Sequence, residues 1–149
     1  MIHGVILTPL RQIFDERGKV MHRLREDSPA FSRFGEIDFS CTYPGVVKAW
    51  HLHREMTLNY AVIYGEIKFV LFDDRFGSPT RGEVQEFFIS PENYMLVTVP
   101  PLIWNGFKCV GTAASIVANC STLPHSPDEL QRRSPSDPGI PYNWALEHR

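Results

Sequence analysis

The sequence predicts an all-β sandwich or barrel that forms one domain over residues 1–149. Short runs rich in β-branched and aromatic residues recur along the chain, and turn-forming residues separate them. Helical periodicity is scarce. A length of 149 residues is ordinary for one domain, and 43% hydrophobic with 21% charged residues is a balance typical of a globular chain.

Eight segments are expected to form strands. In chain order they are residues 5–10, 36–42, 46–53, 58–64, 66–73, 84–89, 96–99 and 115–118. Turns are expected between them at residues 15–18, 43–45, 64–66, 76–79 and 90–93, each of which contains Gly, Pro, Asp or Asn. Regularly spaced strands of this length are typical of a sandwich or barrel.

The C-terminal region departs from this pattern. Ser126 followed by Pro127 and two acids is a good helix start, and it predicts a short C-terminal helix that continues through residues 130–133. The sequence from Ser134 onward is too rich in proline for regular structure. We expect an extended tail that crosses the domain and is anchored by Trp144.

Charge and composition exclude several classes of protein. The net charge is −2 and the basic residues are scattered, so no nucleic-acid partner is expected. No stretch approaches the ~18 apolar residues of a membrane span, and the N-terminus lacks the features of a signal peptide. We therefore expect no membrane association and a cytoplasmic location. Three cysteines without CxxC spacing indicate neither a disulfide framework nor a zinc site.

The segment around His51 and His53 carries the chemistry. On a regular strand these two histidines share one face with Val47 and Ala49. If that face points into a barrel, two imidazoles project into a cavity with an apolar floor. A lone strand histidine is usually structural, but a pair preceded by Lys48 is less ordinary. Histidine has the near-neutral pKa that a base needs to remove a weakly acidic proton.

A series of motifs resembles the dTDP-4-dehydrorhamnose 3,5-epimerase family over most of the chain. In order they are Phe14-Asp15-Glu16-Arg17-Gly18, Lys48-Ala49-Trp50-His51, Asp73-Asp74-Arg75 with Ser78-Pro79-Thr80, and Asn105-Gly106-Phe107. The resemblance implies a cupin double-stranded β-helix, also called a jelly-roll barrel, and a homodimer without a cofactor. It also implies a substrate, a nucleotide-diphosphate 4-keto-6-deoxyhexose, which is epimerised at C3, C5 or both during synthesis of deoxysugar or polysaccharide precursors.

The same resemblance assigns roles to individual residues. His51 lies where the family has its proton-abstracting histidine, so it is the expected base. The expected substrate-binding residues are Arg17, Lys48, His53, Arg75 and Asn105. Of these, Lys48, Arg17 and Arg75 match basic positions of the family, and Asn105 replaces a histidine.

The acid that returns the proton is less well matched. The family's catalytic tyrosine falls at Ala118, and no counterpart follows Trp144 for the carboxylate that orients the family's histidine. Without that tyrosine, inversion at one centre or a substitute acid becomes more plausible. Tyr60 is the expected substitute, and Tyr64 is an alternative.

Three other functions stay open. His51-x-His53-Arg54 with Gly65 downstream also resembles the 3,4-ketoisomerases of dTDP-4-keto-6-deoxyglucose, but the segment from Asp74 to Thr80 fits the epimerases better. A metal-dependent cupin with ligands His51, His53 and Glu55 is disfavoured by their close spacing, so no metal is expected. The third open function is that of a protein that binds a sugar nucleotide without catalysing a reaction.

Overall fold

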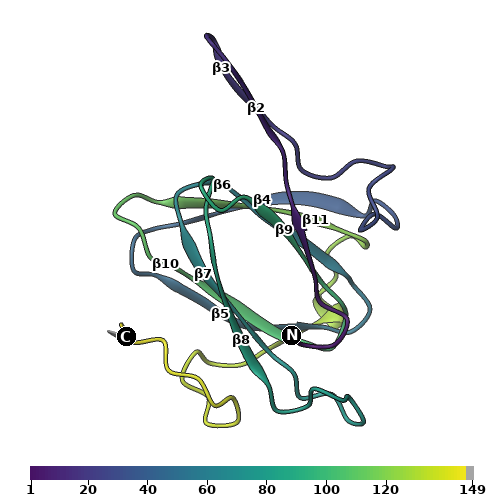
Figure 1. Cartoon of the computed structure of the whole chain (residues 1–149). Coiled ribbons are helices and arrows are strands. Elements are labelled where there is room, and N and C mark those ends of the chain that lie inside the picture. The colour runs from purple at the N-terminus through teal and green to yellow at the C-terminus, as the bar shows by residue number, and fades with distance from the viewer. Residues whose placement is uncertain (147–149) are drawn as a thin grey trace.

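Two five-stranded antiparallel sheets face each other and form a barrel (Figure 1). The structure, a computed structural model, describes residues 1–146. The first sheet has the order β1 (Ile6–Pro9), β9 (Met95–Val99), β6 (Leu58–Tyr64), β11 (Ser115–Ser121), β4 (Glu36–Thr42). The second has the order β12 (Leu130–Arg132), β5 (Val47–His53), β10 (Trp104–Cys109), β7 (Ile67–Phe72), β8 (Val84–Ile89). The all-β prediction is confirmed, and each of the expected strands is present.

A two-stranded hairpin extends away from the barrel (Figure 1). It consists of β2 (Gln12–Asp15) and β3 (Gly18–Met21), and its turn is the one expected at residues 15–18. The two strands themselves were missed. Phe14 and Val20 on this hairpin are 68% and 61% exposed, so these side chains contribute little to the core of their own chain.

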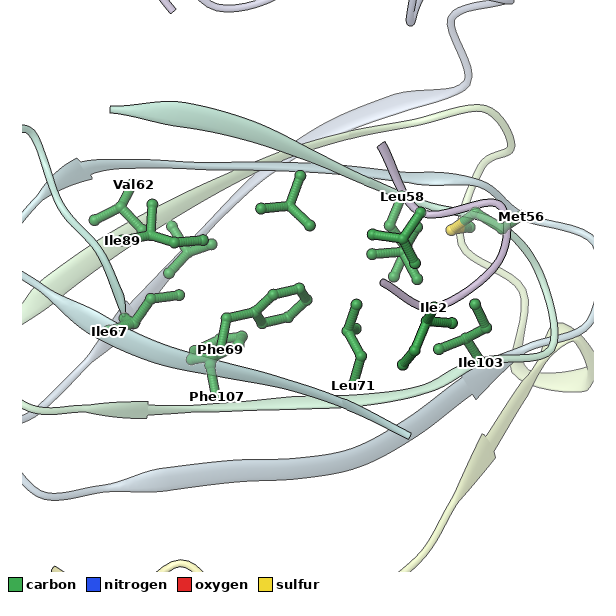
Figure 2. Packing of buried hydrophobic residues seen from close by; sticks show 14 residues of the cluster. Ile2, Met56, Leu58, Val62, Ile67, Phe69, Leu71, Ile89, Ile103 and Phe107 are labelled. Atoms are coloured by element: carbon green, nitrogen blue, oxygen red, sulfur yellow. The ribbon is translucent and has the colours of Figure 1, made fainter. Parts of the chain in front are cut away.

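The core lies between the inner faces of the two sheets (Figure 2). Strand alternation directs Leu58 and Val62 of β6 inward, and Phe69 and Leu71 of β7 meet them from the opposite sheet. These side chains are essentially fully buried. The core fills only part of the barrel, and its member Phe107 also borders a cavity.

The predicted C-terminal helix is wrong. Only a single turn of 3₁₀ helix, η1 (Pro127–Glu129), follows Ser126, and the chain then forms β12. β12 pairs with the edge of β5, so that Leu130 lies opposite His53 and Arg132 opposite His51. A helix of one or two turns is marginal alone, whereas an unpaired strand edge offers backbone partners.

The extended tail and its anchor are confirmed. Trp144 packs against Trp50 on the outer face of the second sheet, with ring centroids 5.0 Å apart. Lys108 Nζ donates a hydrogen bond of 3.0 Å to the Trp144 carbonyl oxygen. The tail therefore covers the side of β5 that faces away from the core. Within residues 1–146, no helix has the length and apolar character needed to cross a membrane.

Candidate active site

A cavity of about 450 Å³ lies between the two sheets beside the hydrophobic core. Strands β4, β6 and β11 form one wall, β5, β10 and β12 form the other, and two residues come from loops. The lining residues are Glu36, Asp38, Ser40, Lys48, His51, His53, Met56, Tyr60, Phe107, Asn119, Ser121, His125, Leu130 and Arg132. Titratable side chains therefore converge on one cavity from segments far apart in the sequence.

A bulge in β5 determines which of its side chains enter the cavity. Lys48 pairs with Phe107 and His51 with Asn105, so two residues of β5 oppose the single residue Gly106. The bulge breaks the alternation, and Lys48, His51 and His53 all line the cavity. The expectation that Val47 and Ala49 share the face of the histidines is wrong, since both pack on the outer cluster around Trp50.

Gly106 makes this bulge possible. A Cβ atom at this position would lie 2.5 Å from the Cβ and 3.0 Å from the Cα of Ala49. Such distances are too short for any side chain, so the two backbones can approach this closely only because residue 106 is glycine.

The two walls are joined at one end of the cavity by Lys48. Its Nζ donates hydrogen bonds of 2.8 Å to Ser40 Oγ and 2.8 Å to the Cys41 carbonyl oxygen. Asp38 is the next cavity-facing residue of β4. In the sheet it lies opposite Asn119 of β11, and Asn119 lies opposite Tyr60 of β6. His51 is the next such residue of β5, so it faces the wall that carries Asp38 and Tyr60.

His51 is held as a neutral imidazole. Burial, followed by the charges of Arg132, His53 and Lys48, lowers its pKa from 6.5 to about 4. Among the described residues its ring has no hydrogen-bond partner. At neutral pH this imidazole can accept a proton from a molecule in the cavity.

His53 differs because it has a carboxylate partner. Its Nδ1 lies 2.7 Å from Glu129 Oε2, and both side chains are almost buried. Glu129 Oε1 accepts backbone N–H bonds of 2.9 Å from Glu55 and 2.8 Å from Met56. Burial opposes the charge of Glu129, but these N–H groups and His53 outweigh it and lower the pKa of Glu129. The pair therefore contains an ionised carboxylate.

Tyr60 lies on the opposite wall, and its ring forms an edge-to-face contact with Phe69 at a centroid distance of 5.1 Å. Burial, and then the charge of Asp38, raises the pKa of Tyr60, so the phenol stays protonated. Ala118 lies beside Ala61, whose cluster packs on the outer face of this sheet. In this chain, residue 118 therefore points away from the cavity.

Both expected substrate-binding arginines lie outside the cavity. Arg17 is at the tip of the projecting hairpin, 90% exposed and paired with Asp15 at 2.6 Å. Arg75 binds its own loop and the N-terminal segment, because Nη2 donates to Asp73 Oδ2 at 2.9 Å and to the His3 carbonyl oxygen at 2.7 Å. In a single chain neither guanidinium is brought together with His51.

Asn105 lies on β10, directly beside His51 in the sheet, and does not line the cavity. It is buried, and its Nδ2 donates to the His51 carbonyl oxygen at 3.1 Å. Asn105 therefore contacts the backbone of His51 and helps to hold that residue in place next to the bulge.

Several cavity residues were missed from the sequence. Arg132 was expected in the helix, and only the pairing of β12 with β5 carries it beside His51. Glu129 gave a signal only as an acid in the first turn of that helix, and Asp38 gave none. Within residues 1–146, no group of three or more His, Cys, Asp or Glu side chains is arranged to hold a metal ion.

Comparison with known proteins agrees with this geometry. The chain is 31% identical over 151 residues to the spore coat polysaccharide biosynthesis protein SpsL of Bacillus subtilis (strain 168), covering 100% of both chains. It is 36% identical over 144 residues to the probable low-salt glycan biosynthesis epimerase Agl13 of Haloferax volcanii, covering 95% of this chain and 89% of that one.

A solved structure is also closely similar. The dTDP sugar isomerase of Desulfovibrio desulfuricans G20 superposes with a TM-score of 0.96 at 44% identity, covering 99% of this chain and 94% of that one. The family model for dTDP-4-dehydrorhamnose 3,5-epimerase matches residues 1–149. The chain therefore belongs to the dTDP-4-dehydrorhamnose 3,5-epimerase family.

Proposed function

We propose that this protein is an epimerase of a nucleotide-diphosphate 4-keto-6-deoxyhexose in the synthesis of polysaccharide or deoxysugar precursors. The observation that carries the proposal is the position of His51, a neutral imidazole that faces a protonated tyrosine across the cavity. The names of the relatives, a polysaccharide biosynthesis protein and a glycan biosynthesis epimerase, support the same class of reaction.

The two walls suit inversion of a carbon next to a ketone. His51 removes the proton from this carbon, and the electron pair forms an enolate with the neighbouring carbonyl. Tyr60 then delivers a proton from the opposite wall, to the other face of the same carbon. Base and acid on opposite walls are what inversion requires, whereas a single base would return the proton to the face it left.

The cations of the cavity suit the diphosphate. Lys48 and Arg132 flank His51, and the Arg132 guanidinium has no hydrogen-bond partner among the described residues. Arginine binds phosphate oxygens through two parallel N–H bonds. A bound diphosphate also offsets the positive charges that lower the pKa of His51, which makes the base stronger when the substrate is present.

We further infer a homodimer in which the hairpin of one chain reaches the cavity of its partner. Exposed apolar side chains support this: Phe14 on the hairpin, and Ile37 and Phe39 on the outer face of β4. In such a dimer Arg17 adds a third cation for the diphosphate. A cytoplasmic location remains a prediction, which cell fractionation tests.

The decisive experiment is a panel of dTDP-, CDP- and GDP-4-keto-6-deoxyhexoses incubated with the protein in deuterated water and followed by NMR. We expect deuterium at C3, C5 or both, with inverted configuration, and no incorporation by His51→Asn, because the amide cannot take a proton. Incorporation by His51→Asn at the wild-type rate would remove His51 as the base.

A ketoisomerase is the second candidate, because both histidines of the His51-x-His53 motif face the cavity. The same experiment separates the two reactions, since a ketoisomerase moves the carbonyl from C4 to C3. Binding of the sugar nucleotide without exchange at any carbon identifies a non-catalytic binding protein instead.

A further inference from the structure

The strongest feature not used by this reaction is the pair formed by His53 and Glu129. Glu129 is fixed through both carboxylate oxygens, because Oε1 accepts the backbone N–H groups of Glu55 and Met56 and Oε2 contacts His53 Nδ1 at 2.7 Å. With Nδ1 held by a carboxylate, the free nitrogen of the ring is Nε2, and His53 lines the cavity beside His51.

A carboxylate at Nδ1 fixes the ring orientation of a histidine and lies next to any positive charge that forms on the ring during a reaction. His51 has no such partner and is held neutral. The two neighbouring imidazoles therefore have different electrostatic environments: His51 is suited to accept a proton and His53 to donate one.

We propose that His53, positioned by Glu129, donates a proton to the ketone oxygen of the substrate while His51 removes the proton from the adjacent carbon. This assignment rests on the proposed function. His51 and His53 are two residues apart on one strand face, about 7 Å along the strand, so their rings can reach two neighbouring groups of one sugar.

The step is balanced in atoms and electrons. His51 takes the proton of the C–H bond, the electron pair of that bond forms the carbon–carbon double bond, and the carbonyl π pair moves to oxygen. The oxygen then takes the Nε2 proton of His53, which becomes neutral while Nδ1–H remains on Glu129. When the enol returns to the ketone, His53 regains this proton and Tyr60 protonates the carbon.

Glu129→Gln tests the role of the carboxylate specifically, because its two oxygens have different partners. The amide oxygen of glutamine can still accept both backbone N–H groups, so the loop keeps its hydrogen bonds. Only the side facing His53 changes from an acceptor to an N–H donor. That donor forces Nδ1 to be the acceptor, so His53 is left as a neutral ring with its proton on Nε2, a far weaker acid than the doubly protonated ring that the proposed step uses.

The expected result is a fall in kcat of roughly 100-fold for Glu129→Gln and for His53→Gln, with KM unchanged. The double variant should lose no more than either single variant, because the two residues act as a unit. Nitrogen-15 spectra of the histidine rings, recorded without any substrate, should show protons on both ring nitrogens of His53 in the wild type and on Nε2 alone in Glu129→Gln. Glu55→Gln, which alters an exposed carboxylate of the same loop, is the matched control and should leave kcat unchanged.

The inference is overturned if Glu129→Gln keeps the wild-type kcat, or if the losses of the single variants multiply in the double variant. Failure of the proposed function looks different: the wild type itself would then incorporate no deuterium from any sugar nucleotide of the panel. The protonation of the two ring nitrogens of His53 can be measured in either case.

Discussion

His51 links the chemistry of the cavity to the stability of the fold. Its folded-state pKa is about 4, against 6.5 for an unperturbed imidazole, so between these pH values the unfolded chain binds a proton that the folded chain does not. The free energy of unfolding should therefore rise with pH across this window, by ~2 kcal/mol for a partly exposed group. The stabilisation is lost as pH falls from 6.5 toward 4.

Urea unfolding at pH 4.5 and pH 7 checks this prediction, with His51→Asn as the reference. Asparagine does not titrate, so the difference in unfolding free energy between the two proteins should change with pH. Parallel pH dependences in the two proteins would mean that His51 titrates normally.

Tyr60 can be separated from His51 by its stereochemical effect. In Tyr60→Phe the base still removes the proton and returns a deuteron to the same face, so exchange continues, while inversion falls by roughly 100-fold. NMR reports both quantities on one sample. Since the Tyr60 hydroxyl has no hydrogen bond among the described residues, the melting temperature should barely change. Full inversion in Tyr60→Phe would point to another acid, such as Asp38 on the same wall.

The basic residues should divide into a binding group and a structural one. Lys48→Ala and Arg132→Ala should raise KM about 10-fold with little change in kcat, since phosphate contacts are made equally in the ground and transition states. Arg75→Ala should leave KM unchanged but destabilise the protein by about 3 kcal/mol, because it removes the cation beside the buried carboxylate of Asp73. Steady-state kinetics and denaturant titrations of the three variants test this division. A raised KM in Arg75→Ala would show that Arg75 does bind the substrate.

At the scale of elements, the bulge between β5 and β10 positions the catalytic groups. Gly106→Ala places a methyl group 2.5 Å from the Ala49 Cβ, so one strand must move. We expect a destabilisation of about 1–3 kcal/mol, which is typical of a methyl group added to a packed site, together with a lower kcat. Gly111→Ala is the control, since its nearest neighbour would lie 3.9 Å away. Equal behaviour of the two variants in melting and turnover would show that the bulge tolerates a side chain.

At the scale of the whole molecule, the projecting hairpin predicts a dimer with shared cavities. Light scattering should give twice the chain mass of 17.1 kDa. Mixing inactive His51→Asn with impaired Arg17→Ala subunits should restore about a quarter of the wild-type activity, because random heterodimers carry one site with both residues intact. A mixture no more active than its components, or a monomer in scattering, contradicts the shared site.

Local patterns were sufficient for most of the barrel. Short runs rich in β-branched and aromatic residues, bounded by turn residues such as Gly and Pro, predict strands directly, so segments such as 58–64 and 84–89 could be assigned from sequence. The anchoring of the tail by Trp144 was also accessible, since a large aromatic residue in a proline-rich segment has few other ways to be buried.

What the sequence by itself determined about this protein is the all-β class, the His51-x-His53 pair and the motifs of its family. Only the tertiary structure decided that Lys48 shares the cavity with both histidines, that β12 brings Arg132 beside His51, and that Glu129 binds His53. The physical reason is that strand alternation is a local property, whereas a bulge depends on the close approach of a second backbone at Gly106. Likewise, a short segment after Ser126 has no strong preference of its own, and the unpaired edge of β5 decides its conformation.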